Sequence, residues 1–206
     1  MQQLAIKLQD LKSNSIILLN IRLRVDQQYP ALYYARSTML PLNGQFISAA
    51  NLAMQTIQRR SLTTDQYVYD QFVQARTLWL QIITQFRMYI INRLSSIAEH
   101  DLDTQTHDIE IFSRELVVLL NDLKSNKRVG LDFEQLELVD RMLGLARRWH
   151  EDFRKVKIIN KSNSWRLDRV LRTDKLDPSI KEIAGMVHAL QRNIDANLSS
   201  EITLLS

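Results

Sequence analysis

Arginine side chains interrupt an apolar helical stripe in this sequence, and they are the residues best suited to bind a ligand. Steps of three and four residues connect Phe72 with Ile97 along an apolar stripe, but this stripe also passes through Arg76 and Arg93. An unpaired guanidinium in an apolar contact is costly, so each of these arginines needs an anion or access to water. Its planar set of donors suits a carboxylate or a phosphate. The stripe therefore indicates either an anion-binding pocket or an internal layer of ion pairs. The acidic residues that would complete such ion pairs are Asp70, Glu110 and Asp152.

Two further arginines and two tryptophans extend this set of candidates. Arg22 and Arg36 fall on the corresponding stripe of the first predicted helix. Trp79 and Trp149 also lie on apolar stripes, where they either pack in the core or line a cavity between helices. The candidate ligand-binding residues are Arg22, Arg36, Arg76, Trp79, Arg93 and Trp149.

A third tryptophan has a different setting. Trp165 lies in the polar segment SNSWRLDR, residues 162–169, and is followed by Arg166. Exposed aromatic and arginine residues are frequent at the centres of protein interfaces. We therefore take Trp165 and Arg166 as candidates for contact with a partner.

Catalytic and cofactor-binding patterns are missing from the sequence. It contains no nucleophile elbow, P-loop, zinc-protease motif or dinucleotide fingerprint. A count of 4 Gly leaves little room for a phosphate-cradling loop, and the absence of cysteine excludes thiol catalysis and disulfides. The histidines and aspartates of residues 100–108 match no familiar zinc or iron spacing. We predict no catalytic residue, no metal and no cofactor, and hence a protein that is not an enzyme.

The charge distribution argues against a nucleic-acid partner. The net charge is +4, with 27 Lys and Arg against 23 Asp and Glu spread along the chain. The densest basic clusters are pairs such as Arg59 and Arg60. A nucleic-acid-binding face requires a basic patch or stripe, which these pairs do not form.

Helical periodicity runs through almost the whole chain. Breakers are scarce, at 4 Gly and 3 Pro, and no segment alternates as a strand would. We predict an all-α fold, an antiparallel bundle of about five to six helices in a single domain over residues 1–206. Two stacked four-helix-like subdomains are the alternative. The predicted helices are a long first helix over 1–40, then 45–60, a long helix over 64–100, a shorter one over 105–125, 132–162 and a last helix over 178–206.

Prolines and capping residues set the predicted helix ends. Pro30 predicts a kink or short break within the first helix. Pro41 and Gly44, in the segment LPLNG, predict a full stop between the first two helices. Asp177 before Pro178 reads as the N-cap and first position of the last helix.

The overall plan resembles the extracytoplasmic sensor domains of bacterial membrane receptors, which include sensor histidine kinases, chemoreceptors and diguanylate cyclases. Both ends of the sequence lie within helical pattern, so we expect the first and last helices to continue beyond it. The segment RSTMLPLNGQFISAANLAM, residues 36–54, and the segment SNSWRLDR, residues 162–169, carry the resemblance further.

This resemblance implies a periplasmic module without catalysis that binds a small anion or a periplasmic binding protein. It further implies flanking transmembrane helices in the full-length protein and a homodimer formed through the first helices. The signal would pass through sliding or rotation of the terminal helices by ~1–2 Å. The alternative is a cytoplasmic helical adaptor or scaffold that acts by protein–protein interaction.

Overall fold

The computed structural model describes residues 2–58, 65–95, 99–126, 130–162 and 165–204. Of these residues 94% are helical and none forms a strand, which confirms the predicted all-α bundle. The chain divides into two compact units, one over residues 31–160 and the other over residues 1–30 with 161–206. We call the first the bundle and the second the terminal unit.

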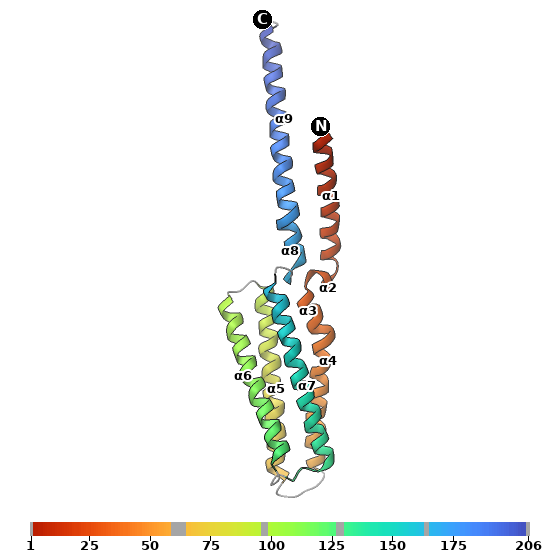
Figure 1. Ribbon diagram of the computed structural model, residues 1–206, viewed down its shortest axis with the longest axis vertical. Coiled ribbons are helices and arrows are strands. Elements are labelled where there is room, and N and C mark those ends of the chain that lie inside the picture. Colours follow the sequence, from red (N-terminus) through yellow and green to blue (C-terminus); the bar gives the residue numbers. More distant parts are fainter. Residues whose placement is uncertain (1, 59–64, 96–98, 127–129, 163–164, 205–206) are drawn as a thin grey trace. The chain divides into compact units, whose positions relative to one another are not determined.

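The bundle consists of four long helical segments that alternate in direction and lie side by side (Figure 1). The first segment joins α3 (Pro30–Tyr34), a π-helix η1 (Ala35–Met39) and α4 (Leu40–Gln58) without interruption. It is followed by α5 (Asp65–Leu94), α6 (Glu99–Ser125) and α7 (Phe133–Lys161). Each segment buries one apolar face, as four packed amphipathic helices must.

Aromatic rings fill the middle of the bundle core. Trp79 stacks on Phe46 with ring centroids 4.2 Å apart, and Trp149 meets Trp79 edge-on at 5.7 Å. Trp149 also stacks on Phe153 at 5.7 Å. These rings come from α4, α5 and α7, so they tie together helices that are distant in sequence and supply much of the buried apolar area.

The terminal unit contains α1 (Gln2–Arg22), α2 (Val25–Gln28), α8 (Leu167–Leu171), a π-helix η3 (Arg172–Leu176) and α9 (Asp177–Leu204). Within this unit α1 lies alongside α9 and runs in the opposite direction (Figure 1). Lys7 of α1 pairs with Glu182 of α9 at 2.9 Å. No residue of α1 is buried.

The predicted stop at Pro41 and Gly44 is wrong, and the predicted start of a second helix at residue 45 is therefore wrong too. The helix continues through both residues because a π-turn precedes the proline: the Leu40 N–H donates to the Ala35 carbonyl, five residues back. In an α-helix a proline clashes with the carbonyl four residues earlier. The wider π-turn gives the Pro41 ring room and keeps the chain helical.

The same arrangement recurs before Pro178. The Asp177 N–H donates to the carbonyl of Arg172, again five residues back, and η3 ends two residues before the proline, as η1 does. Asp177 has helical dihedral angles, φ −60° and ψ −42°, so the predicted N-cap is wrong. The last helical run begins with α8 rather than at residue 178.

The remaining helix ends are partly as predicted. The break at Pro30 is confirmed: α1 ends at Arg22, Tyr29 is not helical and α3 begins at the proline. The predicted gap between a helix that ends at residue 100 and one that begins at residue 105 is wrong, because α6 begins at Glu99. Leu102 is buried and continues the apolar stripe of α6, so packing extends this helix through its polar first turns.

Candidate ligand-binding site

Arg76 and Arg93, the two arginines on the predicted apolar stripe of α5, lie at the edge of its buried face and not in its centre. The buried apolar residues that define the centre are Val68, Phe72, Ala75, Trp79, Ile82, Phe86 and Tyr89. Arg76 directly follows Ala75 and is exposed, while Arg93 is half-buried. A stripe built from alternating steps of three and four residues has a slightly shorter period than the helix, which has 3.6 residues per turn, so the stripe moves gradually around the helix surface. Arginines at the edge of a stripe can reach water with their charged ends.

Three of the four predicted arginines bind other parts of the protein. Arg76 donates to the Asn51 side-chain oxygen at 3.3 Å. Arg93 donates to the backbone carbonyl of Asn160. In the terminal unit, Arg22 lies 3.5 Å from the Asp168 carboxylate.

The acidic residues proposed as arginine partners bind other donors. Glu110 accepts a bond of 2.6 Å from Lys157. This bond and the lysine charge lower the pKa of Glu110, against a smaller opposing effect of burial. The buried Asp152 carboxylate accepts bonds of 2.7 Å from the Tyr34 hydroxyl and 2.9 Å from Lys155. The bundle therefore carries ion pairs at its partly exposed edge, and lysines, not the predicted arginines, supply the cations.

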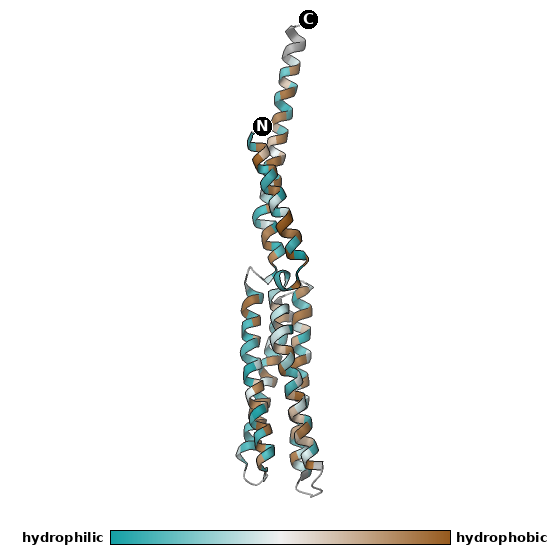
Figure 2. Cartoon of the chain, turned by 90° about the vertical axis from the view of Figure 1, so that its right-hand side faces the viewer, coloured by the Kyte–Doolittle hydropathy of each residue, from teal (hydrophilic) through white to brown (hydrophobic). Residues whose placement is uncertain are grey.

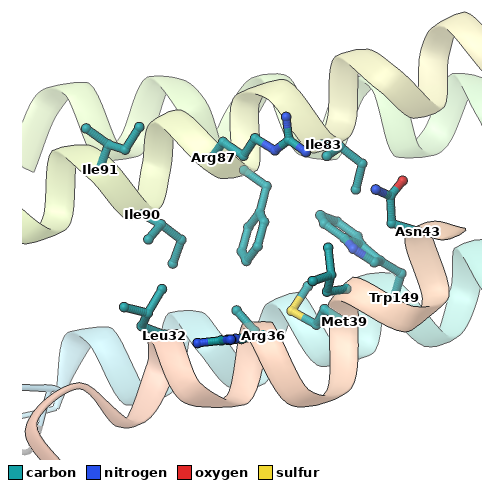
Figure 3. A pocket seen from close by; sticks show the side chains of 12 residues that line it. Leu32, Arg36, Met39, Asn43, Ile83, Arg87, Ile90, Ile91 and Trp149 are labelled. Atoms are coloured by element: carbon teal, nitrogen blue, oxygen red, sulfur yellow. The ribbon is translucent and has the colours of Figure 1, made fainter. Parts of the chain in front are cut away.

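The fourth arginine, Arg36, lines a pocket of about 420 Å³ in the bundle. The pocket lies between the first helical segment and α5, and Trp149 of α7 forms part of its wall (Figure 3). Its lining residues are Leu32, Ala35, Arg36, Met39, Leu40, Asn43, Ile83, Phe86, Arg87, Ile90, Ile91 and Trp149.

Every polar side chain of this pocket can donate a hydrogen bond. Arg36 and Arg87 come from the two facing helices (Figure 3), and both are exposed. Neither makes a side-chain hydrogen bond or ion pair with the part of the chain that the structure describes. The Asn43 side-chain oxygen accepts a bond of 2.8 Å from Trp79 Nε1. This bond orients the amide and leaves its NH₂ group as the remaining donor.

The π-helix η1 determines which side chains reach the pocket. It contributes Ala35, Arg36 and Met39 to the wall. Its wider turn keeps Ala31, Ala35 and Met39 buried at steps of four residues. Arg36 then falls at the exposed rim beside them, with its stem along the apolar wall.

The pocket thus brings together two of the predicted ligand-binding residues, Arg36 and Trp149. Trp79 does not line the pocket, but its indole N–H donates a hydrogen bond to the side-chain oxygen of Asn43, which does line it. Sequence reasoning missed Arg87 and Asn43. The sequence does contain a signal for Arg87, which lies four residues after Ile83 and three and four residues before Ile90 and Ile91. It is therefore a cation with apolar neighbours one helical turn away on either side.

The candidate partner-facing residues lie in the terminal unit. Trp165 and Arg166 are half-buried and line a small polar hollow of about 330 Å³ with residues of α8 and η3. Arg166 donates to the Asp168 carboxylate at 2.9 Å, and its guanidinium lies 5.8 Å from the Tyr29 ring centre. Contact with a partner stays a prediction for both residues.

Asp168 is the buried acid of the terminal unit. Burial by itself raises its pKa, but the hydrogen bond from Arg166 and the charges of Arg166 and Arg22 outweigh this effect, so the net pKa is lowered. The carboxylate is therefore the centre of a small ionic cluster that joins residues from both ends of the chain.

Other kinds of site lack support within the described residues. No group of three or more His, Asp or Glu side chains there is arranged to hold a metal ion. Burial lowers the pKa of His150, with a further contribution from the Arg154 charge, which favours its neutral form. Among the described helices, none combines the length and the apolar character that a membrane span requires.

Comparison with protein-family models, with curated protein sequences and with solved structures gives no match to this chain.

Proposed function

We propose that the chain is the ligand-binding region of a bacterial membrane receptor and that its ligand occupies the pocket between the first helical segment and α5. The observation that carries this proposal is the pocket itself, about 420 Å³ in volume and walled mainly by apolar side chains. Small-molecule sites are concave, mostly apolar and about 300–1,000 Å³ in volume, with a few polar groups that fix the ligand.

A π-turn in the wall of the pocket supports a role in signalling. Ala35 and Met39 pack from this turn into the core, while Arg36 beside them reaches the pocket. A π-turn has poorer packing and hydrogen bonding than an α-turn, and such turns are frequent at functional sites. A ligand that contacts η1 would change the balance between its arrangements, and helix shifts of ~1–2 Å are a known form of such a response.

We also propose that the receptor is a homodimer joined through the terminal unit. Large apolar residues are exposed on its two long helices, α1 and α9: Leu8, Ile16, Leu19, Ile180, Val187, Ile194 and Leu198. Figure 2 shows hydrophobic residues, in brown, at intervals along the two helices that carry the chain ends. Helices that repeat apolar residues at steps of seven, as Ile180, Val187 and Ile194 do, are suited to pair with further helices.

A thermal-shift screen of the purified chain tests the ligand site. The library contains neutral, cationic and anionic small molecules with both apolar and polar bodies. A ligand at a hundred times its dissociation constant stabilises the folded state by about 2.7 kcal/mol, which raises the unfolding temperature by several degrees. We expect at least one saturable hit.

A matched pair of variants locates that hit. Leu32→Trp places an indole in the pocket and should abolish the stabilisation, because Leu32 lines the wall. Tyr33→Trp is the control, since Tyr33 is the next residue, is 52% exposed and does not line the pocket. A screen without hits, or hits that survive Leu32→Trp unchanged, would overturn the proposed site.

The second candidate function is a cytoplasmic helical adaptor, which the exposed apolar residues of the terminal unit also favour. Cellular location separates the two. Alkaline phosphatase needs disulfides and is active only in an oxidising compartment. Fused in the native full-length protein directly after Asn126, it should be active if this region is periplasmic. An inactive fusion together with a fluorescent cytoplasmic reporter at the same position would favour the adaptor.

A further inference from the structure

We infer that the ligand of the bundle pocket is a small organic acid with an apolar body, whose carboxylate is held by Arg36, Arg87 and the Asn43 amide. This inference rests on the proposed function and specifies the chemistry of the same site.

The apolar walls define the body of the ligand. Side chains of Leu32, Met39, Ile83 and Ile90 face the pocket (Figure 3), and none of them can satisfy a polar group. A sugar, an inorganic anion or a polar amino acid would lose hydrogen bonds to water on entry without replacing them, which is costly. A hydrocarbon chain or an aromatic ring gains free energy from the same walls.

The charges at the pocket define the head group. Among the described residues that line it, Arg36 and Arg87 are charged and none is acidic. Both guanidinium groups have their donors available, because neither makes a side-chain hydrogen bond or ion pair with the described residues. Two cations without a counter-charge repel an amine and attract a carboxylate, which a guanidinium can bind through two parallel hydrogen bonds.

Asn43 adds a neutral donor that is fixed before the ligand binds. The bond from Trp79 Nε1 to its oxygen, 2.8 Å long, directs the NH₂ group away from Trp79. Trp79 is itself only 1% exposed, so its indole cannot turn away easily. A donor that is already oriented costs less conformational entropy on binding than a free side chain.

The volume favours a free acid over a membrane lipid. At about 420 Å³ the pocket is near the lower end of the usual range for small-molecule sites, roughly 300–1,000 Å³. An aryl-alkyl or medium-chain monocarboxylic acid suits such a volume, whereas a two-chain lipid does not.

Isothermal titration of the full chain with matched ligand pairs tests this inference. The pairs are 3-phenylpropionate with 3-phenylpropionamide, and octanoate with octanamide, and the two members of each pair share the apolar body but carry a charged carboxylate or a neutral amide as head group. We expect each acid to bind about tenfold more tightly than its amide, because hydrogen bonds to a charged acceptor are the stronger ones. The preference should weaken as salt is added, since both arginines are exposed.

Charge-matched variants assign the preference to the two arginines. Arg36→Met and Arg87→Met should each remove most of the difference in affinity between acid and amide. Arg147→Met is the control, because Arg147 is exposed on α7 outside the pocket and its loss changes the net charge equally. The control should keep the full preference.

The outcomes separate this inference from the proposed function. Equal binding of acid and amide, or hits in the wider screen that are all neutral or cationic, would overturn the inference and leave the pocket as a ligand site. Retention on anionic lipid vesicles without binding of the free acids would also overturn it. A screen without any hit would instead overturn the proposed function.

Discussion

The two units of this chain are built from similar amphipathic helices but are held together in different ways. In the bundle, Trp79 and Trp149 are each 1% exposed, and aromatic rings join α4, α5 and α7. In the described part of the terminal unit, the buried residues are Asp168 and Leu176, and α1 buries none. Apolar burial dominates the first unit, and ionic contacts are prominent in the second.

This difference shows that an apolar stripe predicts a helix but does not predict how deeply that helix is buried. A helix in a four-helix bundle has neighbours on both sides of its stripe, whereas α1 and α9 have mainly each other within their unit. The apolar stripe of each helix is wider than the surface that the other helix covers, so part of it remains exposed. The side chains of Leu19 and Ile194, for example, are 60% and 56% exposed. Exposed stripes of this kind mark surfaces for further association.

The largest expected effect comes from opening the aromatic core of the bundle. Trp149→Ala should destabilise the bundle by about 3–5 kcal/mol, because it removes a fully buried indole and leaves a cavity. Chemical denaturation followed by circular dichroism measures this change. Trp165→Ala is the matched control, since Trp165 is half-buried in the terminal unit and should cost far less. Equal losses for the two variants would contradict the contrast drawn between the units.

An intermediate effect is expected from removing the buried acid of the terminal unit. Asp168→Ala should destabilise α8 and its surroundings by about 1–3 kcal/mol, because it removes the hydrogen bonds that Arg166 donates and leaves that cation without its carboxylate. Hydrogen exchange should accelerate in α1, α8 and η3 and stay unchanged in the core of the bundle. Asp174→Ala removes the same charge from an exposed position of η3 and serves as the control. Faster exchange throughout the bundle would show that the two units unfold together.

The smallest expected effect is a loss of stability in the terminal unit at acidic pH. The pKa of Asp168 is lowered in the folded state, so the unfolded chain, with an aspartate pKa of about 3.9, binds this proton more readily. The stabilisation is complete above the unfolded value and is lost as the pH falls through the lower folded value. Protection of the α8 amides from exchange, measured relative to the unfolded chain at the same pH, should therefore fall below about pH 4. Asp168→Asn should remove this acid dependence, and its persistence in that variant would assign it to other carboxylates.

Much of the architecture was predictable because it depends on local pattern. The stripe of Phe72, Trp79, Ile83 and Phe86 was assigned correctly to a helix core, and all four residues are buried. Helix α7, over Phe133–Lys161, matches its predicted range within one residue at each end. Both depend on helical periodicity, which a sequence displays directly.

The remainder depends on geometry that periodicity does not contain. Arg36 and Arg76 were placed on seams but lie one position from the buried faces, because small differences in helical period accumulate along a helix. The pocket arises from the spacing of two helices, so its inclusion of Arg87 and Asn43 could not be predicted from either helix alone. The prediction of a stop at Pro41 and Gly44 fails because the rule for proline assumes an α-helix and not a π-turn.

The two π-turns have a consequence for the lengths of homologous chains. A π-turn holds one residue more than an α-turn over the same rise, so each can be regarded as a single-residue insertion placed two residues before a proline. A homologue without proline at position 41 or 178 could omit one residue there and keep the phase of the helix on both sides. A one-residue deletion elsewhere in α4 or α9 would instead rotate everything beyond it by about 100°. Gaps in future alignments should therefore concentrate at these two turns and coincide with loss of the proline.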